Sequence, residues 1–216
     1  MSELLREIEE EIRRERLLAV WKKYHTLIIG TVLAVVVGTA GVAGWHEWRD
    51  SRNSRATAEL SALVLQAPAD PAQSAQALAS FAQNAPASQA MLARLHEAGA
   101  LAKAGKTTEA IQIWDTVSAD RSVDAPWRDL ATLLSVMHQA DSGDPVALLK
   151  RLEPLTGADS SWRFSAREWA AVLKARSGNR AEAAQMLHAL ASDPQTPASL
   201  RERATDLALA YEGAAP

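Results

Sequence analysis

The sequence contains no cysteine, which excludes a disulfide framework, a thiol nucleophile and a thiolate metal site. A chain without cysteine is compatible with both reducing and oxidising compartments, so this absence does not locate the protein. Lysine and arginine are spread along the chain without a basic stripe, and the formal net charge is -3. We therefore expect no nucleic-acid partner.

Catalytic signatures are also missing from the sequence. The segment HEAGA at 96–100 lacks the second histidine of a zinc-protease helix, and the glycines form neither a dinucleotide-binding fingerprint nor a phosphate-binding loop. No Gly-x-Ser-x-Gly motif is present. The histidines are scattered, and each is better explained as a polar helix-face residue than as a metal ligand. We expect no enzymatic activity, no cofactor and no metal.

Strand patterns are absent beyond Trp48. Period-two alternation of Val, Ile, Thr and aromatic residues does not occur there, and Ala, Leu, Glu, Gln and Arg dominate. The 48% of apolar and 23% of charged residues are typical of a chain that folds. An all-α protein is predicted, and 216 residues leave room for one sizeable domain and an appendage.

An uncharged apolar run extends from Thr26 to Gly44. Its 19 residues at about 1.5 Å each give a helix of about 28 Å, close to the roughly 30 Å hydrocarbon core of a bilayer. Its nine strongly apolar residues together favour insertion by about 4 kcal/mol. Aromatic residues flank the run as in the two interfacial belts of a span, namely Trp21, Tyr24, Trp45 and Trp48. We predict a transmembrane helix over 26–48.

A cleaved signal peptide is the main alternative, because Gly41 and Ala43 are small enough for a signal peptidase. A secretory apolar region is usually only about 7 to 15 residues long and follows a short basic segment. Here 25 residues precede the run, and they read as a helix. An uncleaved anchor is therefore the preferred interpretation, with a cleaved signal and a buried soluble helix as alternatives.

Charge asymmetry across the span predicts its orientation. Residues 6–25 contain six Lys and Arg residues, whereas residues 45–64 contain three, and the more basic side faces the cytoplasm. Residues 1–25 should then form a cytoplasmic amphipathic helix, and residues 49–216 an exported domain. The cytoplasmic helix could be a solvated extension of the span or a site for a partner.

Small residues recur every four positions in the span at Gly30, Ala34 and Gly38. This spacing puts them on one helix face, a pattern that permits close packing of helices in lipid. Glycine is common in membrane spans in any case, so a specific helix partner and a neutral role both remain open.

Internal repeats divide the exported part. AGKTTEAIQIW at 104–114 aligns with SGNRAEAAQML at 177–187, and WRDLATLLSVMHQADSGD at 127–144 aligns with WRFSAREWAAVLKARSGN at 162–179. The turn glycines lie 38 and 35 residues apart, at Gly105, Gly143 and Gly178. Because these spacings are close to the 34-residue period of tetratricopeptide (TPR) repeats, we predict a TPR-like solenoid of helical hairpins.

Local signals mark the ends of the predicted helices. We expect the turn glycines to supply the positive φ that terminates the first helix of each hairpin. Asp70-Pro71 and Asp144-Pro145 combine a capping carboxylate with a proline at the first helical position. A first hairpin over about 50–84 and a final lone helix over about 197–212 complete the set, the last as the polar cap that a solenoid needs.

The tryptophans of the repeats have two interpretations. Trp114, Trp127, Trp162 and Trp169 would fill gaps between short Ala-rich helices, or else anchor a partner. The pairs Trp127-Arg128 and Trp162-Arg163 are the candidate anchors. The TPR register additionally directs four residues towards the concave face, namely Lys103, Met137, Glu168 and Arg176.

The order of these features resembles a known family. A Glu- and Arg-rich helix, one span near residue 30, a following Trp, and an Ala-rich repeat array with GNRAEAAQML and SDPQTPASLRERA look like the YfgM-type ancillary subunits of the bacterial SecYEG translocon. The resemblance covers essentially the whole chain and rests on architecture more than on an invariant site. It implies a single-pass inner-membrane protein with a periplasmic TPR-like domain.

The resemblance also implies partners. These would be translocon subunits, periplasmic chaperones including a peptidyl-prolyl isomerase, and exported client proteins, with membrane lipid contacted through the one span. The short unit at 144–155 and the Ala or Leu residues at many large aromatic positions of the consensus depart from a regular TPR. An anchored scaffold of another envelope assembly, for cell division or outer-membrane biogenesis, is the alternative.

Overall fold

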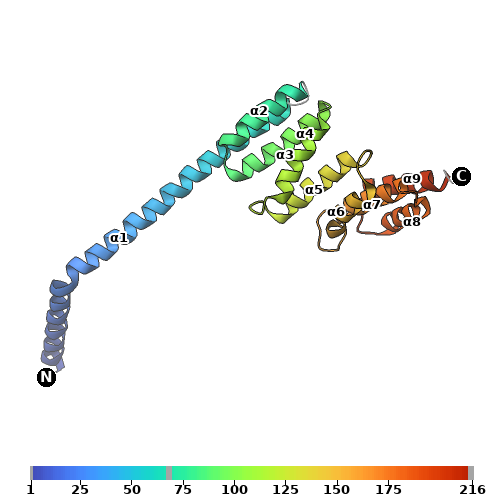
Figure 1. Cartoon of the computed structure of the whole chain (residues 1–216). Coiled ribbons are helices and arrows are strands. Elements are labelled where there is room, and N and C mark those ends of the chain that lie inside the picture. The colour runs from blue at the N-terminus through green and yellow to red at the C-terminus, as the bar shows by residue number, and fades with distance from the viewer. Residues whose placement is uncertain (1, 67–69, 214–216) are drawn as a thin grey trace. The chain divides into compact units, whose positions relative to one another are not determined.

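The computed structural model describes residues 2–66 and 70–213, and within these ranges all regular structure is helical (Figure 1). The all-α prediction is confirmed. The first helix, α1 (Ser2–Gln66), is 65 residues long. It is followed by α2 (Pro71–Asn84), α3 (Ala87–Lys103), α4 (Thr107–Ala119), α5 (Ala125–Gln139), α6 (Pro145–Leu152), the 3-10 helix η1 (Glu153–Leu155), α7 (Arg163–Arg176), α8 (Arg180–Ser192) and α9 (Ala198–Gly213).

Contacts divide the chain into two units, of which one ends at Arg55 and the other begins at Ala56. In the first unit, α1 carries the apolar run with its described side chains exposed. Within Trp21–Leu65, α1 is long and apolar enough to cross a membrane by length and composition. The boundaries expected from the sequence, at residues 25 and 48, fall inside this continuous helix and remain predictions.

The second unit is a succession of helical hairpins. The end of α1 pairs with α2 by placing Leu60 in a buried cluster with Leu78 and Ala82. Next come the hairpins α3/α4, α5/α6 and α7/α8, each helix packing on the next, and α9 closes the array on α8 (Figure 1). Contacts of α5 with α7 and of α7 with α9 join the first helices of successive hairpins, as a TPR-like solenoid requires.

Two of the three turn glycines behave as predicted. Gly105 has φ of 80° and Gly178 has φ of 89°, a region that side chains with a Cβ rarely adopt. The same prediction for Gly143 is wrong, because this residue is not among the positive-φ glycines. A Cβ at Gly143 would lie 3.0 Å from the Gln139 carbonyl oxygen and 3.0 Å from a methyl group of Leu148, so a side chain there would be tightly crowded.

Both predicted aspartate caps are confirmed. The Asp70 carboxylate accepts bonds of 3.0 and 3.1 Å from the backbone N–H groups of Ala72 and Gln73. The Asp144 carboxylate accepts bonds of 3.2 Å from Val146 and Ala147. Each aspartate accepts hydrogen bonds from N–H groups that have no acceptor inside the helix. The proline after it has no N–H group, so it leaves no donor unpaired.

Alanine sets the distance between the packed helices. A fully buried alanine, 0% exposed, occurs in each helix that forms a hairpin contact from α3 to α9 except α6, and these residues are Ala93, Ala98, Ala110, Ala131, Ala166, Ala171, Ala183, Ala204 and Ala208. Leucine fills the spaces between them. Small side chains allow close approach of the helix backbones. Close packing of this kind is compatible with Ala or Leu at many positions where the repeat consensus has a large aromatic residue.

Candidate functional site

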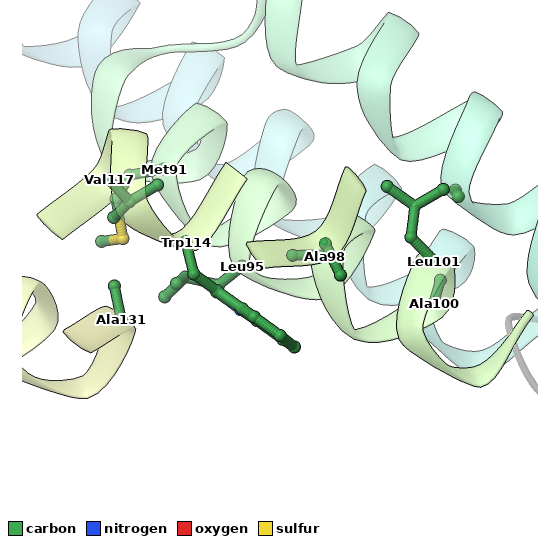
Figure 2. Packing of buried hydrophobic residues seen from close by; sticks show 10 residues of the cluster. Met91, Leu95, Ala98, Ala100, Leu101, Trp114, Val117 and Ala131 are labelled. Carbon is green, nitrogen blue, oxygen red and sulfur yellow. The ribbon is translucent and has the colours of Figure 1, made fainter. Parts of the chain in front are cut away.

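The four tryptophans of the repeat domain have different environments. Trp114 is 1% exposed and lies among Met91, Leu95 and Ala131 in a core formed by α3, α4 and α5 (Figure 2). Its ring stacks on His138 with the ring centroids 4.6 Å apart. Trp114 is therefore a core residue.

Two further tryptophans hold neighbouring repeats together. Trp162, which precedes α7, donates a 2.7 Å hydrogen bond from its indole nitrogen to the Pro126 carbonyl at the start of α5. Trp169 packs partly buried against the cluster that contains Leu133 and Leu173. Trp127 is the exception, because 38% of it is exposed.

The arginines predicted as partner anchors also make internal contacts. Arg128 donates a 2.8 Å hydrogen bond to the Val123 carbonyl. Arg163 donates one of 3.1 Å to the Gln195 side chain and lies 4.1 Å from the centre of the Phe164 ring. These contacts fix the start of α5 and the start of α7, which limits what either guanidinium can offer to a partner.

The predicted position of Lys103, Met137 and Arg176 on a concave face stays a prediction, and the structure shows what surrounds each side chain. Lys103 is exposed, whereas Met137 is half-buried and packs against the core of α5 to α7. Arg176 is exposed, but its guanidinium donates a 2.6 Å hydrogen bond to the Ala140 carbonyl at the end of α5. Met137 and Arg176 are thus engaged inside the domain, which leaves Lys103 as the exposed side chain of the three.

The expectation that Glu168 lies on an open face is wrong. Glu168 is 3% exposed, and its two carboxylate oxygens accept bonds from the Arg203 guanidinium of α9, one of them at 2.6 Å. Hydrogen bonding to Glu168 raises the pKa of Arg203. Helix α9 covers α7 at this point. The Glu168 side chain, which the repeat register predicts to be exposed, is therefore buried in an ion pair.

A polar network that sequence reasoning missed joins α4, α5 and α6. Arg151 lies 2.5 Å from a carboxylate oxygen of Asp115, and buried Ser135 donates to the same oxygen at 2.6 Å. Gln139 donates to the Ser135 hydroxyl at 2.9 Å. No local sequence pattern predicts this network. Only Ser135 and Gln139 are one helical turn apart, and the other bonded pairs are separated by 16 to 36 residues.

The exposed Trp127 borders a cleft of about 530 Å³. The end of α2, the first half of α3, the α4–α5 loop and the start of α5 form its walls. Its apolar lining comprises Ala82, Ala85, Ala87, Ala90, Met91, Leu92, Val123 and Trp127, and its polar lining comprises Ser88, Arg94, Asp120, Ser122 and Asp124. Small side chains on one wall and an indole on the other are suited to a bulky apolar side chain of a partner.

Two carboxylates give the cleft a charged margin. Asp120 accepts bonds from the Ser122 hydroxyl at 2.7 Å and its backbone N–H at 2.9 Å, and these lower the pKa of Asp120, with smaller contributions from Arg94 and Arg128. Asp124 occupies the N-cap position of α5 but its side chain makes no capping bond. Both acids and the Arg94 guanidinium are thus positioned at the margin of an apolar cleft.

A second groove of about 700 Å³ lies over α2, α3 and α4. Its lining combines small and apolar residues of α2, α3 and α4 with six polar ones, namely Gln73, Gln76, Glu97, Lys106, Glu109 and Gln112. Lys106 and Glu109 are already paired with each other at 3.6 Å. Without an exposed aromatic residue, this groove is the weaker candidate for binding.

The small-residue face of the apolar run is open. A Cβ added at Gly30 or at Gly38 would meet no atom within 4 Å, and Ala34 is exposed. The structure thus leaves room for a second helix, and a specific partner there stays a prediction.

Among the described residues, no group of three or more His, Asp or Glu side chains is arranged to hold a metal ion.

Comparison with known proteins supports the repeat architecture. Neither the curated proteins nor the solved structures contain a match to this sequence. The family model described as "Tetratricopeptide repeat-like domain" matches residues 19–189, which include the apolar run and the hairpins as far as the last turn of α8, and leave out α9. Since this match covers well over half of the chain, the protein belongs to the tetratricopeptide repeat-like domain family.

Proposed function

We propose that this protein is a membrane-anchored protein-binding module of the bacterial inner membrane, with its N-terminus in the cytoplasm and its TPR-like domain in the periplasm. Tetratricopeptide repeat-like domains generally bind other proteins through the surfaces of their stacked hairpins. The family match supports the binding role. The resemblance to the YfgM-type subunits supports the finer assignment, an ancillary subunit of the SecYEG translocon that works with periplasmic chaperones.

One observation carries the proposal. The same chain joins an apolar helix, whose described side chains in the run are exposed, to a repeat domain that keeps one tryptophan at the edge of a cleft. Leaving Val35 and Val37 60% and 64% exposed would be costly in water and is stabilising in lipid. A protein built in this way holds a binding surface close to a membrane.

The cleft beside Trp127 is the proposed binding site. The indole is more exposed than any other tryptophan of the repeat domain, and tryptophans in such positions commonly dominate binding energy. Met91 and Val123 offer apolar contact inside the cleft. We propose that a segment of a translocon subunit, a chaperone such as a prolyl isomerase, or an exported client places an apolar side chain there.

A scaffold role in cell division or in outer-membrane biogenesis is the second candidate. It uses the same anchor and the same cleft, so the two candidates differ only in the partner. Extraction of the full-length chain in mild detergent, followed by identification of co-purifying proteins, separates them. Recovery of translocon subunits supports the first candidate, and recovery of another envelope assembly without them supports the second.

A photo-crosslinking residue in place of Trp127 tests the site itself. We expect it to trap a partner, and we expect Trp127→Ala to reduce co-purification of the same protein about tenfold or more, as hot-spot tryptophans do. Leu209→Ala is the matched control, because Leu209 is 57% exposed and lies outside the cleft. Equal retention of the partner by both variants would place the interface elsewhere.

The orientation has a separate test. A reporter fused after Pro216 should be active only in the periplasm, and protease added to spheroplasts should digest the chain beyond residue 49. Cytoplasmic activity of the fusion would reverse the orientation. A mature chain that begins near Gly44 would instead support the cleaved signal peptide.

A further inference from the structure

We infer that one face of α1 between Trp45 and Arg55 binds the phosphate groups of anionic phospholipids at the far surface of the membrane. This face, called the Trp–Arg face below, consists of Trp45, Trp48, Arg49, Arg52 and Arg55. The inference rests on the proposed membrane span. It adds a lipid ligand of defined chemistry to a segment that the span alone does not explain.

Helical spacing separates the charges of this segment by sign. At about 100° per residue, the five residues of the Trp–Arg face fall within an arc of about 120°. Glu47 and Asp50 lie on the opposite side of the helix, about 140° to 160° from the centre of that arc. The face is therefore uniformly cationic and aromatic, which complements a surface of phosphate groups.

Side-chain positions agree with this use. Trp45 and Trp48 are 62% and 54% exposed, and their ring centroids are 5.2 Å apart. The Arg52 guanidinium lies 5.7 Å from the centre of the Trp48 ring, so it extends back towards the N-terminal turn. Within the described residues, none of the three arginines of the face forms an ion pair with a carboxylate.

The distance from the apolar run places Arg49 at the edge of the headgroup layer, with Arg52 and Arg55 about one and two helical turns farther out. Counting from Gly44, Arg49 lies about 7 Å and Arg52 about 12 Å farther along the helix, while the polar layer on each side of a bilayer is about 5 to 7 Å deep. Helical side chains point towards the N-terminus, which here is towards the membrane. The long arginine side chains can thus reach phosphates below their own Cα atoms.

The basic residues nearest the apolar run at its opposite end have a different geometry. Lys22 and Lys23 precede the apolar run, so their side chains lean away from the hydrocarbon. A lysine is also a point charge, whereas a guanidinium can donate two parallel bonds to one phosphate. The selective contact with anionic headgroups is therefore assigned to the Trp–Arg face.

Phospholipid is a better occupant than a protein partner for two reasons on this helix. The face continues directly from the apolar run, and its two tryptophans are the residues that favour a lipid–water interface. Attraction to an anionic surface amounts to about a fivefold gain per basic residue, so loss of three such residues should weaken binding by about a hundredfold if all three contribute fully, and by at least about tenfold if two do.

Native mass spectrometry of the full-length chain in detergent provides the test. Phosphatidylglycerol and phosphatidylcholine are titrated separately against the natural chain, the triple variant Arg49→Gln, Arg52→Gln, Arg55→Gln, and a control triple variant Lys103→Gln, Lys106→Gln, Arg201→Gln. The control removes the same charge from exposed positions outside α1. We expect at least tenfold weaker phosphatidylglycerol binding for the first variant alone, with phosphatidylcholine binding unchanged.

Three outcomes are decisive. A first variant that binds phosphatidylglycerol as the natural chain does would overturn the inference, and equal losses in both variants would reduce it to a net-charge effect. Displacement of the lipid by millimolar inorganic phosphate would show a free-phosphate site and overturn the lipid assignment. An Arg→Lys triple variant should retain part of the affinity if charge contributes, and helicity should be the same in all variants.

The proposed span is checked in the same preparation. All variants should float with phosphatidylcholine vesicles and resist alkaline extraction, because the apolar run is unchanged. Failure of the natural chain to float would contradict the span itself. A chain that floats but shows no preference for phosphatidylglycerol contradicts only the lipid contact.

Discussion

The two units of this protein use the same apolar residue types with opposite exposure. In the first unit, Leu33 and Val36 are 63% and 56% exposed, whereas Leu78, Leu152 and Leu173 in the second are 0% exposed. The repeat domain buries its leucines by pairing helices, and the first unit is one helix without an internal partner. The comparison shows that an apolar sequence specifies a helix but not the phase that surrounds it.

The units also differ in how their helices end. Helices α2 to α9 are 8 to 17 residues long. They begin after caps such as Asp70 and Asp144 and end at turns such as those at Gly105 and Gly178. Helix α1 continues for 65 residues through four glycines, and the first proline of the sequence is Pro68. Each glycine costs about 1 kcal/mol in a helix in water, but in hydrocarbon an unpaired backbone group costs several kcal/mol. A lipid environment thus favours the unbroken helix.

The largest effect is expected in the core of the second unit. Trp114→Ala should lower the free energy of unfolding of residues 49–216 by about 3 to 5 kcal/mol, because it leaves a large cavity between α3, α4 and α5. Urea unfolding monitored by circular dichroism measures the loss. Trp127→Ala is the control and should cost less than about 1 kcal/mol, since its indole is 38% exposed. Equal losses would mean that exposure does not distinguish these tryptophans.

The next largest effect tests what surrounds the first unit. Val36→Arg should lower the membrane-bound fraction sharply, because a central arginine costs about 2.5 to 3.5 kcal/mol on the insertion scale. Flotation with vesicles measures that fraction. Val146→Arg makes the same change at a residue of α6 that is 70% exposed, and it should leave both flotation and stability unchanged. Normal flotation of both variants would contradict the membrane span.

A smaller effect is expected at a helix end. Asp144→Ala should destabilise the repeat domain by about 1 kcal/mol, because two N–H groups of α6 lose their acceptor. Thermal unfolding of residues 49–216 detects this change. Asp159→Ala provides the control, since Asp159 is exposed in the loop before α7. A loss for both variants would point to net charge instead of capping.

The smallest effect concerns acid. Burial lowers the pKa of His138 from its ordinary value of 6.5, so the folded state binds this proton less readily than the unfolded state. Stability should therefore be complete above pH 6.5 and decrease as the pH falls below it. His138→Gln should reduce the loss of stability between pH 7 and pH 5. A steeper loss in the variant would show that the Trp114 ring stabilises the charged imidazole.

Several features followed from local sequence because their causes are local. The aspartate caps at 70 and 144 and the left-handed turns at Gly105 and Gly178 each depend on a few consecutive residues. Helical propensity and the absence of strand patterns predicted the all-α fold. The repeat period predicted the hairpin array, because every unit repeats the same packing problem at the same spacing.

The terminal helix changes the environment that the repeat register predicts for Glu168. The repeat register treats Glu168 as part of an open face, but α9 covers it and supplies Arg203 as the partner. Nothing near Glu168 in the sequence identifies a guanidinium 35 residues away. The prediction failed because burial of a charged group depends on which element lies over it. Here the capping helix α9 lies over Glu168, whereas the repeat register predicts an open face at this position.

The sequence alone determined which segments are helical, where most of them end, that they repeat, and that one is apolar enough for a membrane. Only the tertiary structure decided that Trp114 is buried, that Trp127 remains at a cleft, and that a Cβ at Gly143 would be tightly crowded. Propensity, capping and periodicity act over a few residues or one helix face. Burial is the sum of contacts from several helices, so the same residue type becomes core or surface according to its neighbours in space.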